Sequence, residues 1–239
     1  MATPQLDSEG FYYLIGETFP GERGKNAYTL HNADLLWSYL IKTYKWTLPA
    51  VCAFFGAITY ECDFNPRCVE GGLSTPTKDS GVGYVQWTPS TMLTDYANQW
   101  GVPWYLSTTQ MRKWELERTT TDSSVKQWFV FNPYKAKYLE DFSEESIYFT
   151  QDSFCSTADF VNGNTPRSLS AQIVEFYTRS GSWANKDNWT RNAEMFSFFY
   201  ERYSGQEPPN PPEPPNPPEP PTPPSKKGGL KVWQMIRYH

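Results

Sequence analysis

A long stretch without charge stands out in the pattern of hydrophobic and polar positions. From Leu48 to Tyr60 no residue is charged, so a helix here would be apolar on every face. A helix of that kind belongs in a buried position. Thr47 is a good N-cap residue, and Pro49 suits the first turn, where the N–H that proline lacks would have no partner. The pattern predicts a buried helix from Leu48 to about Glu61.

Amphipathic segments on either side predict a mainly helical domain. Asn32 or Asp34 can cap a helix that runs to about Tyr44 with one apolar stripe. Apolar residues at helical spacing predict further helices over 89–100, 107–119, 168–180 and 189–203. Residues 81–87, GVGYVQW, suit a short strand or an extended turn. The expected fold class is mainly α (α+β), with a small β element.

A proline-rich repeat marks the end of the foldable region. After Gly205 the chain reads QEPPNPPEPPNPPEPPTPPS, which cannot form helix or sheet because proline fixes φ and lacks a donor. We expect a polyproline II rod of on the order of 50 Å, with a low-complexity tail as the alternative. The expected organisation is an arm over 1–30, a domain over 31–204, a linker over 205–225 and a peptide over 226–239.

The last segment, KKGGLKVWQMIRYH, is apolar and basic but too short to fold alone. A peptide of this kind at the end of a rod suggests a docking strand or helix for a larger assembly. Peripheral contact with a membrane is the alternative.

Composition excludes several classes of protein. A net charge of -5 and a pI of about 5.2 argue against binding to nucleic acid. An aromatic content of 17% rules out disorder throughout the chain. No segment approaches the ~18 apolar residues that span a bilayer. The start, MATPQLDSEG, lacks the basic and apolar regions of a signal peptide.

Metal and disulfide chemistry find little support. The chain has 2 histidines, and no pair of its 4 cysteines has CxxC spacing. We therefore expect no metal site and no cofactor. The cysteines suit a reduced structural role, with a Cys62–Cys68 staple as the alternative.

Glu61 ends the charge-free stretch and is the first candidate for chemistry. Burial beside apolar neighbours disfavours its charged form, and so does the negative end of the helix dipole. No Lys or Arg lies within one turn before Glu61, and Arg67 comes only after it. These effects predict a raised pKa for Glu61, which suits a general acid that protonates a glycosidic oxygen. A solvated carboxylate at the rim of the core is the alternative.

Two motifs around Glu61 resemble the phage tail lysozyme family. The first, GAITYECDFNP, is similar to a small-residue helix that ends in Glu-Ser-x-Phe-Asn-Pro, with Cys62 in place of the serine. The second, GVGYVQW, is similar to Gly-x-Gly-hydrophobic-x-Gln-Trp. The close match covers about residues 48–90, and a looser likeness in helical layout extends from about 33 to 204. More distantly, the pair resembles goose-type lysozymes and lytic transglycosylases.

The resemblance implies a lysozyme-like fold, peptidoglycan as substrate and Glu61 as the catalytic acid. It places the candidate substrate-binding residues at Asn65, Gly83, Tyr84, Gln86 and Trp87. Glycine permits close approach of a sugar to the backbone, although a tight turn would need it equally. Aromatic rings can stack on sugar faces, but most of the aromatic residues must form the core. The same two alternatives, stacking on a sugar or packing in the core, apply to Trp100, Trp104 and Tyr105.

A second carboxylate would decide the mechanism. Inverting hydrolysis needs a base about 6.5–9.5 Å from the acid, and a covalent route needs about 5–5.5 Å. Asp79 is the best candidate because it comes just before the second motif, although an Asp here can also cap a loop. Asp63 and Glu70 are rivals. Goose-type enzymes have an Asp where this chain has Thr88, and without a base a single Glu could still support transglycosylase cleavage.

These observations together predict a virion-associated peptidoglycan hydrolase of the muramidase type. It would cleave between N-acetylmuramic acid and N-acetylglucosamine during phage entry. The rod would hold the domain near the wall, and the C-terminal peptide would bind other tail proteins. The alternatives are a lytic transglycosylase that uses the same glutamate, a free lysin, and a non-catalytic wall-binding or structural tail module.

Overall fold

The computed structural model describes residues 3–16, 18–119 and 186–211. The helices are α1 (Ala27–Ser38), α2 (Leu48–Cys62), α3 (Thr91–Gln99), α4 (Ser107–Thr119) and α8 (Lys186–Tyr203). A π-helical turn over Tyr39–Thr43 extends α1, and a 3-10 turn spans Glu70–Gly72. Strands β1 (Gln5–Leu6) and β2 (Tyr12–Tyr13) pair antiparallel. The described part of the chain is mainly α, as the sequence predicts.

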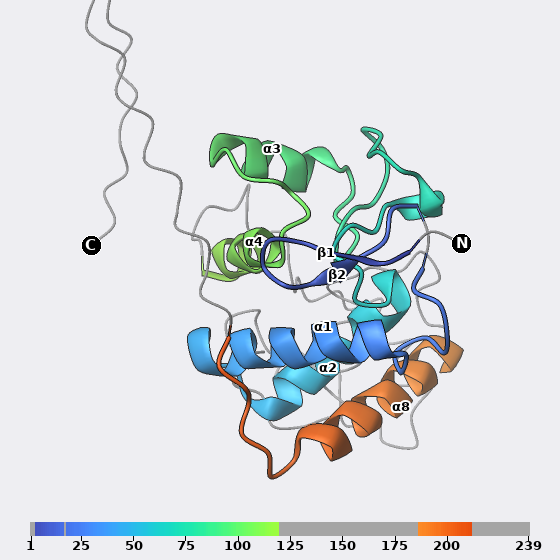
Figure 1. The fold of residues 1–239 in the computed structure, drawn as a ribbon, viewed down its shortest axis with the longest axis vertical. Coiled ribbons are helices and arrows are strands. Elements are labelled where there is room, and N and C mark those ends of the chain that lie inside the picture. The colour runs from blue at the N-terminus through green and yellow to red at the C-terminus, as the bar shows by residue number, and fades with distance from the viewer. Residues whose placement is uncertain (1–2, 17, 120–185, 212–239) are drawn as a thin grey trace, which may run out of the picture.

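Helix α2 is the buried helix that the charge-free stretch predicts. Every residue from Ala50 to Thr59 is buried. The Thr47 side chain caps the helix by accepting a hydrogen bond from the backbone N–H of Ala50 at 3.4 Å. Other helices surround α2, and Figure 1 shows α1, α2 and α8 together in one half of the domain, with α3 in the other. The predicted start and character of this helix are confirmed.

Close contact between α2 and α8 depends on Gly56. A Cβ atom at this position would stand 2.8 Å from the backbone carbonyl oxygen of Asn192, which is closer than such atoms approach. Rings fill the rest of the contact, with Phe55 and Phe199 edge to face at 5.2 Å between centroids. Glycine in the first motif therefore serves helix packing.

Helix α1 begins earlier than the sequence suggested. Its N-cap is Asn26, whose side-chain oxygen accepts from the backbone N–H of Thr29 at 2.9 Å, and not Asn32 or Asp34. The latter two lie inside the helix because their side chains make tertiary contacts. Asn32 binds backbone groups of other segments, and Asp34 pairs with Arg202 of α8 at 2.9 Å.

The other expected helices have mixed outcomes. Helices α3, α4 and α8 fall within or close to the ranges 89–100, 107–119 and 189–203, so these predictions are confirmed. The predicted helix over 168–180 lies outside the described residues.

The N-terminal arm packs on the domain. Glu9 is 3% exposed and accepts hydrogen bonds from the backbone N–H of Thr108, at 3.0 Å, and from its hydroxyl. The side-chain amide of Asn65 donates to the carbonyl of Leu14 at 2.7 Å. The arm thus connects the first turn of α4 with the loop that follows α2.

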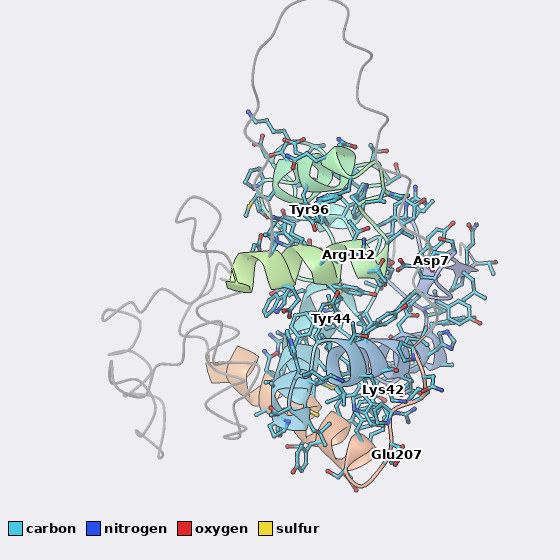
Figure 2. The ribbon with its side chains drawn as sticks, turned by 90° about the vertical axis from the view of Figure 1, so that its left-hand side faces the viewer. Asp7, Lys42, Tyr44, Tyr96, Arg112 and Glu207 are labelled. Carbon is cyan, nitrogen blue, oxygen red and sulfur yellow. The ribbon has the colours of Figure 1, made fainter. Side chains whose placement is uncertain are left out.

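The start of the proline-rich segment returns from α8 to the end of α1. The Ser38 hydroxyl donates to the carbonyl of Pro209, and Lys42 Nζ donates to Asn210 Oδ1 at 2.9 Å. Figure 2 shows Lys42 and Glu207 at the same end of the domain. The tract therefore leaves the fold beside the C-terminal end of α1.

Most of the predicted rod and the peptide over 226–239 lie outside the described residues. Within the ranges that the structure describes, none of the helices has the length and apolar character needed to cross a membrane.

Candidate active site

Glu61 occupies the last turn of α2 and is partly exposed, whereas the body of the helix is buried. The chain turns sharply after it because Asp63 and Phe64 both have left-handed φ values, 51° and 60°. The backbone N–H of Asp63 donates to the carbonyl of Thr59 at 3.1 Å and closes the helix. A buried helix thus holds Glu61 rigidly at the point where it meets the surface.

Arg23 brings a positive charge to this end of α2. Its Nη1 lies 3.4 Å from the carbonyl oxygen of Tyr60, to which it donates. The guanidinium also lowers the pKa of Asp63 and of Cys68, although burial outweighs it at both. Sequence reasoning missed this cation because it precedes Tyr60 by 37 positions and belongs to no local motif. The cationic side chain interacts favourably with the carbonyls at the end of the helix.

Cys68 links Glu61 to the second motif. Its Sγ lies 3.9 Å from the backbone oxygen of Glu61, and its thiol also bonds to the Gln86 side chain. Burial raises the pKa of the thiol to about 11, and the nearby Glu61 carboxylate adds to the shift. Cys68 is therefore a neutral thiol near pH 7. The structure thus brings together two of the predicted site residues, Glu61 and Gln86.

All three cysteines in the described part of the chain, Cys52, Cys62 and Cys68, are free. Cys62 is buried, and its Sγ donates to the carbonyl of Ile58 at 3.4 Å. Burial raises its pKa well above the usual value. These three residues have the reduced structural role that the sequence favoured, and the Cys62–Cys68 staple is not formed.

The second motif forms a small β element. Val82 makes antiparallel bridges with both Val69 and Trp87. Gln86, with a φ of 54°, closes the turn between Val82 and Trp87. Its Nε2 donates to the carbonyl of Gly83 at 2.8 Å. The partly exposed Gln86 side chain is therefore held in one orientation by its own turn.

Both glycines of this motif have internal structural roles. A Cβ at Gly83, whose φ is 75°, would collide with the Gln110 carboxamide, which accepts from the backbone N–H of Tyr84 at 2.7 Å. A Cβ at Gly81 would stand 2.9 Å from Gln86 Oε1. The backbone N–H of Gly83 donates to the carbonyl of Cys68 at 2.9 Å. The tight-turn alternative accounts for these glycines in the described structure.

Three of the predicted substrate-binding side chains lie in the interior. Tyr84 is 0% exposed, Trp87 and Asn65 are 1% exposed, and all three form internal hydrogen bonds. The Tyr84 hydroxyl bonds to the Ser107 hydroxyl at 2.7 Å. The sequence motif does not reveal this burial, because a ring that stacks on a sugar and a core ring have the same residue type.

The candidate carboxylates differ in their surroundings. Asp79 is exposed in the turn that the Ser80 and Thr77 hydrogen bonds close. Glu70 is also exposed, and its Oε2 accepts from the backbone N–H of Gly81 at 2.8 Å. Both carboxylates flank the second motif on its solvent side.

Asp63 has a structural role. It is 1% exposed and accepts hydrogen bonds from the backbone N–H of Gly24 at 2.7 Å, from Thr29 Oγ1 at 3.1 Å and from Asn26 Nδ2 at 3.2 Å. Burial raises its pKa. This carboxylate fixes the arm and α1 to the end of α2.

A mainly helical domain that presents a carboxylic side chain at the end of its buried central helix, beside a small β element, defines a lysozyme-like protein. The model of the phage tail lysozyme family matches residues 31–155, just over half of the 239 residues. The chain belongs to the phage tail lysozyme family. This membership implies a lysozyme-like cell-wall hydrolase of a phage tail.

Proposed function

We propose that the chain is a muramidase that cleaves the glycan strand between N-acetylmuramic acid and N-acetylglucosamine, with Glu61 as general acid. One observation carries the proposal. Glu61 is the partly exposed carboxyl at the end of a helix whose preceding residues, from Ala50 to Thr59, are all buried, and Gln86 lies beside it through Cys68. A rigidly held acid can protonate the departing glycosidic oxygen as the bond breaks.

Asp79 is the proposed base that activates water on the other face of the sugar. Its exposed position at the edge of the second motif leaves it free to approach a bound strand. Glu70 is the rival, but its carboxylate already accepts the backbone N–H of Gly81. Asp63 is excluded from this role by its burial and by its hydrogen bonds to the arm.

Buried members of the two motifs support the site indirectly. We propose that Gln86 contacts the substrate, and that Tyr84, Trp87 and Asn65 hold the surrounding backbone in place. Gly83 allows the Gln110 carboxamide to approach the turn that orients Gln86.

A lytic transglycosylase is the second candidate function. The observation that favours it is the exposed Thr88 in place of the aspartate of goose-type enzymes. Without a second carboxylate, Glu61 could protonate the leaving oxygen and then, as a carboxylate, take up the proton of the substrate's own hydroxyl as that hydroxyl attacks the anomeric carbon. Hydrolysis leaves a reducing muramic acid end, and transglycosylation leaves an anhydro end.

The proposed location is the phage tail, with action on the host wall during entry. The proline-rich tract would act as a spacer and the peptide over 226–239 would bind other tail proteins. Tethering of this kind raises the local concentration of the domain at the wall.

Digestion of purified peptidoglycan by the full chain tests the proposal. Wild type is compared with Glu61→Gln, Asp79→Asn and Glu70→Gln, and the products are identified by mass spectrometry. We expect Glu61→Gln to lose about 10²–10⁴-fold in rate, because it removes the transferable proton and preserves shape. Loss with Asp79→Asn but not with Glu70→Gln would support Asp79 as the base.

Other outcomes would contradict the proposal. Equal rates for wild type and Glu61→Gln would remove Glu61 from catalysis. Anhydro products would establish the transglycosylase. Tight binding to the wall without any release of fragments would establish a non-catalytic module.

A further inference from the structure

An arginine with aromatic neighbours follows the first motif. The guanidinium carbon of Arg67 lies 4.6 Å from the ring centroid of Tyr105 and 5.3 Å from that of Tyr13. The two rings are themselves 6.1 Å apart. All three side chains are partly exposed. Arg67 is therefore held over two rings at the surface of the domain.

The two rings are fixed by further contacts. The Tyr13 hydroxyl donates to Gln5 Oε1 at 2.6 Å across the small antiparallel sheet. Trp104 packs edge to face against Tyr105 at 5.9 Å. The backbone N–H of Arg67 donates to Asn65 Oδ1 at 3.1 Å, which fixes the start of the arginine side chain. The N-terminal arm, the loop after α2 and the segment that leads into α4 thus together orient one guanidinium group.

Among the residues that the structure describes, no carboxylate pairs with Arg67. Carboxylates there pair with other cations, as in Lys25–Glu22, Lys113–Glu117 and Arg202–Asp34. A partly buried cation that is stacked on rings, and that lacks an acidic partner, keeps its planar N–H edge available for a carboxylate or a phosphate. In a chain with a net charge of -5, such a cation is a specific feature and not part of a basic surface.

The position of Arg67 connects it to the candidate site. The next residue is Cys68, whose thiol contacts both Glu61 and Gln86. The backbone of Arg67 therefore adjoins the residue that connects Glu61 to Gln86. The group formed by Arg67, Tyr13 and Tyr105 is called the Arg67 platform here.

We infer that the Arg67 platform binds a free carboxylate of the peptide stem carried by the muramic acid residue. The inference rests on the proposed muramidase function and adds a determinant of specificity to it. The guanidinium fork would donate two parallel hydrogen bonds to the carboxylate, and the tyrosine rings would pack on the peptide. The enzyme would then favour strands that carry stems over bare glycan.

Kinetics with defined substrates test this inference. Soluble glycan fragments with peptide stems are compared with the same fragments after an amidase has removed the stems, both free of phosphate-containing polymers. The variants of the full chain are Arg67→Gln and Arg67→Lys. Arg112→Gln, a change of equal charge at an exposed site on α4 (Figure 2), is the matched control.

We expect Arg67→Gln to raise KM about tenfold for stem-bearing fragments, with kcat unchanged, as loss of one charge-assisted contact predicts. Arg67→Lys should recover only part of the affinity because a point charge cannot form the fork. On stripped fragments neither variant should differ from wild type, and Arg112→Gln should behave as wild type throughout.

Equal effects of Arg67→Gln on both substrates would show a structural role and overturn the inference, as would no effect on either. Walls that retain a phosphate-containing polymer serve as a third substrate, and a loss confined to them would assign the platform to phosphate and overturn the peptide-stem ligand. If wild type cleaves neither fragment, the proposed function fails. In that case, the affinities of wild type and Arg67→Gln for both fragments are measured by calorimetry, which tests the inference separately from the proposed function.

Discussion

The indole N–H of Trp87, in the second motif, donates to both carboxylate oxygens of Glu117 on α4, at 3.2 and 3.4 Å. The same carboxylate pairs with Lys113 Nζ at 2.7 Å, and the two charged side chains are only 1% and 8% exposed. A buried ion pair on α4 therefore holds the β element that carries Gln86. Because the motif residue is anchored this way, the turn that orients Gln86 has a rigid support from the neighbouring helix.

Because of these contacts, removal of the Glu117 carboxylate should cause a large loss of stability. Glu117→Ala leaves Lys113 buried without its partner and the Trp87 N–H without its acceptor, so we expect a loss of about 3–5 kcal/mol in the free energy of unfolding. Urea denaturation followed by tryptophan fluorescence measures it. Glu117→Gln preserves an acceptor for Trp87 and should separate the two contributions. A loss below about 1 kcal/mol in Glu117→Ala would show that the pair adds little.

Glu9 predicts a pH dependence of stability. Burial raises its pKa in the folded protein above the ordinary value of 4.5 and outweighs the hydrogen bonds from Thr108, which lower it. The folded state thus holds the proton more tightly than the unfolded state. This contribution is fully present below pH 4.5 and is lost as the pH rises through the folded pKa.

The matched measurement is urea denaturation of wild type and Glu9→Gln between pH 4 and pH 7. The variant cannot titrate here, and its amide can still bond to Thr108, so its stability relative to wild type should improve as the pH rises. Asp7, which is partly buried with a raised pKa, remains in both proteins, and its charge is one of the causes that raise the pKa of Glu9. A difference that stays constant with pH would contradict the role assigned to Glu9.

Cys68 predicts that the site can be blocked by a thiol reagent. Its pKa of about 11 makes alkylation slow near neutral pH, and the rate should rise about tenfold per pH unit up to that value because the thiolate is the nucleophile. A bulky adduct beside Glu61 and Gln86 should abolish release of wall fragments. Mass spectrometry of the labelled peptide, with activity measured in parallel, checks both statements. Cys68→Ala should keep its activity after the same treatment, and loss of activity in that variant would assign the block to another cysteine.

Local sequence signals predicted α2, the helix that carries Glu61, and its cap. The run without charge from Leu48 to Tyr60 and the Thr47–Pro49 start define α2 because burial and capping act through neighbouring residues. The paired motifs likewise predicted that Gln86 would lie near Glu61. Signals of this kind work because both ends of the interaction lie in short, recognisable segments.

Contacts between distant segments could not be predicted in this way. Arg23 reaches the end of α2 from the arm, and Asp63 is buried because Gly24 and Thr29 supply its donors. The sequence pattern predicts too late a start for α1 for the same reason. Asn32 has the chemistry of a cap, but its amide is used by the backbone of the arm and of the loop after α2.

The two ends of α1 have different neighbours, and this has a mechanical consequence. Its first turn is bound through Thr29 to Asp63, next to Glu61, whereas its last residue, Ser38, holds Pro209 of the proline-rich segment. At about 1.5 Å per residue, Thr29 and Ser38 lie about 14 Å apart along the axis. A pulling force on the chain beyond Asn210 would reach the C-terminal end of α1 through Lys42 and Ser38, and α8 through the covalent chain. Under tension on this segment, the domain would be held at the C-terminal end of α1, and the end that carries Glu61 would stay away from the attachment point.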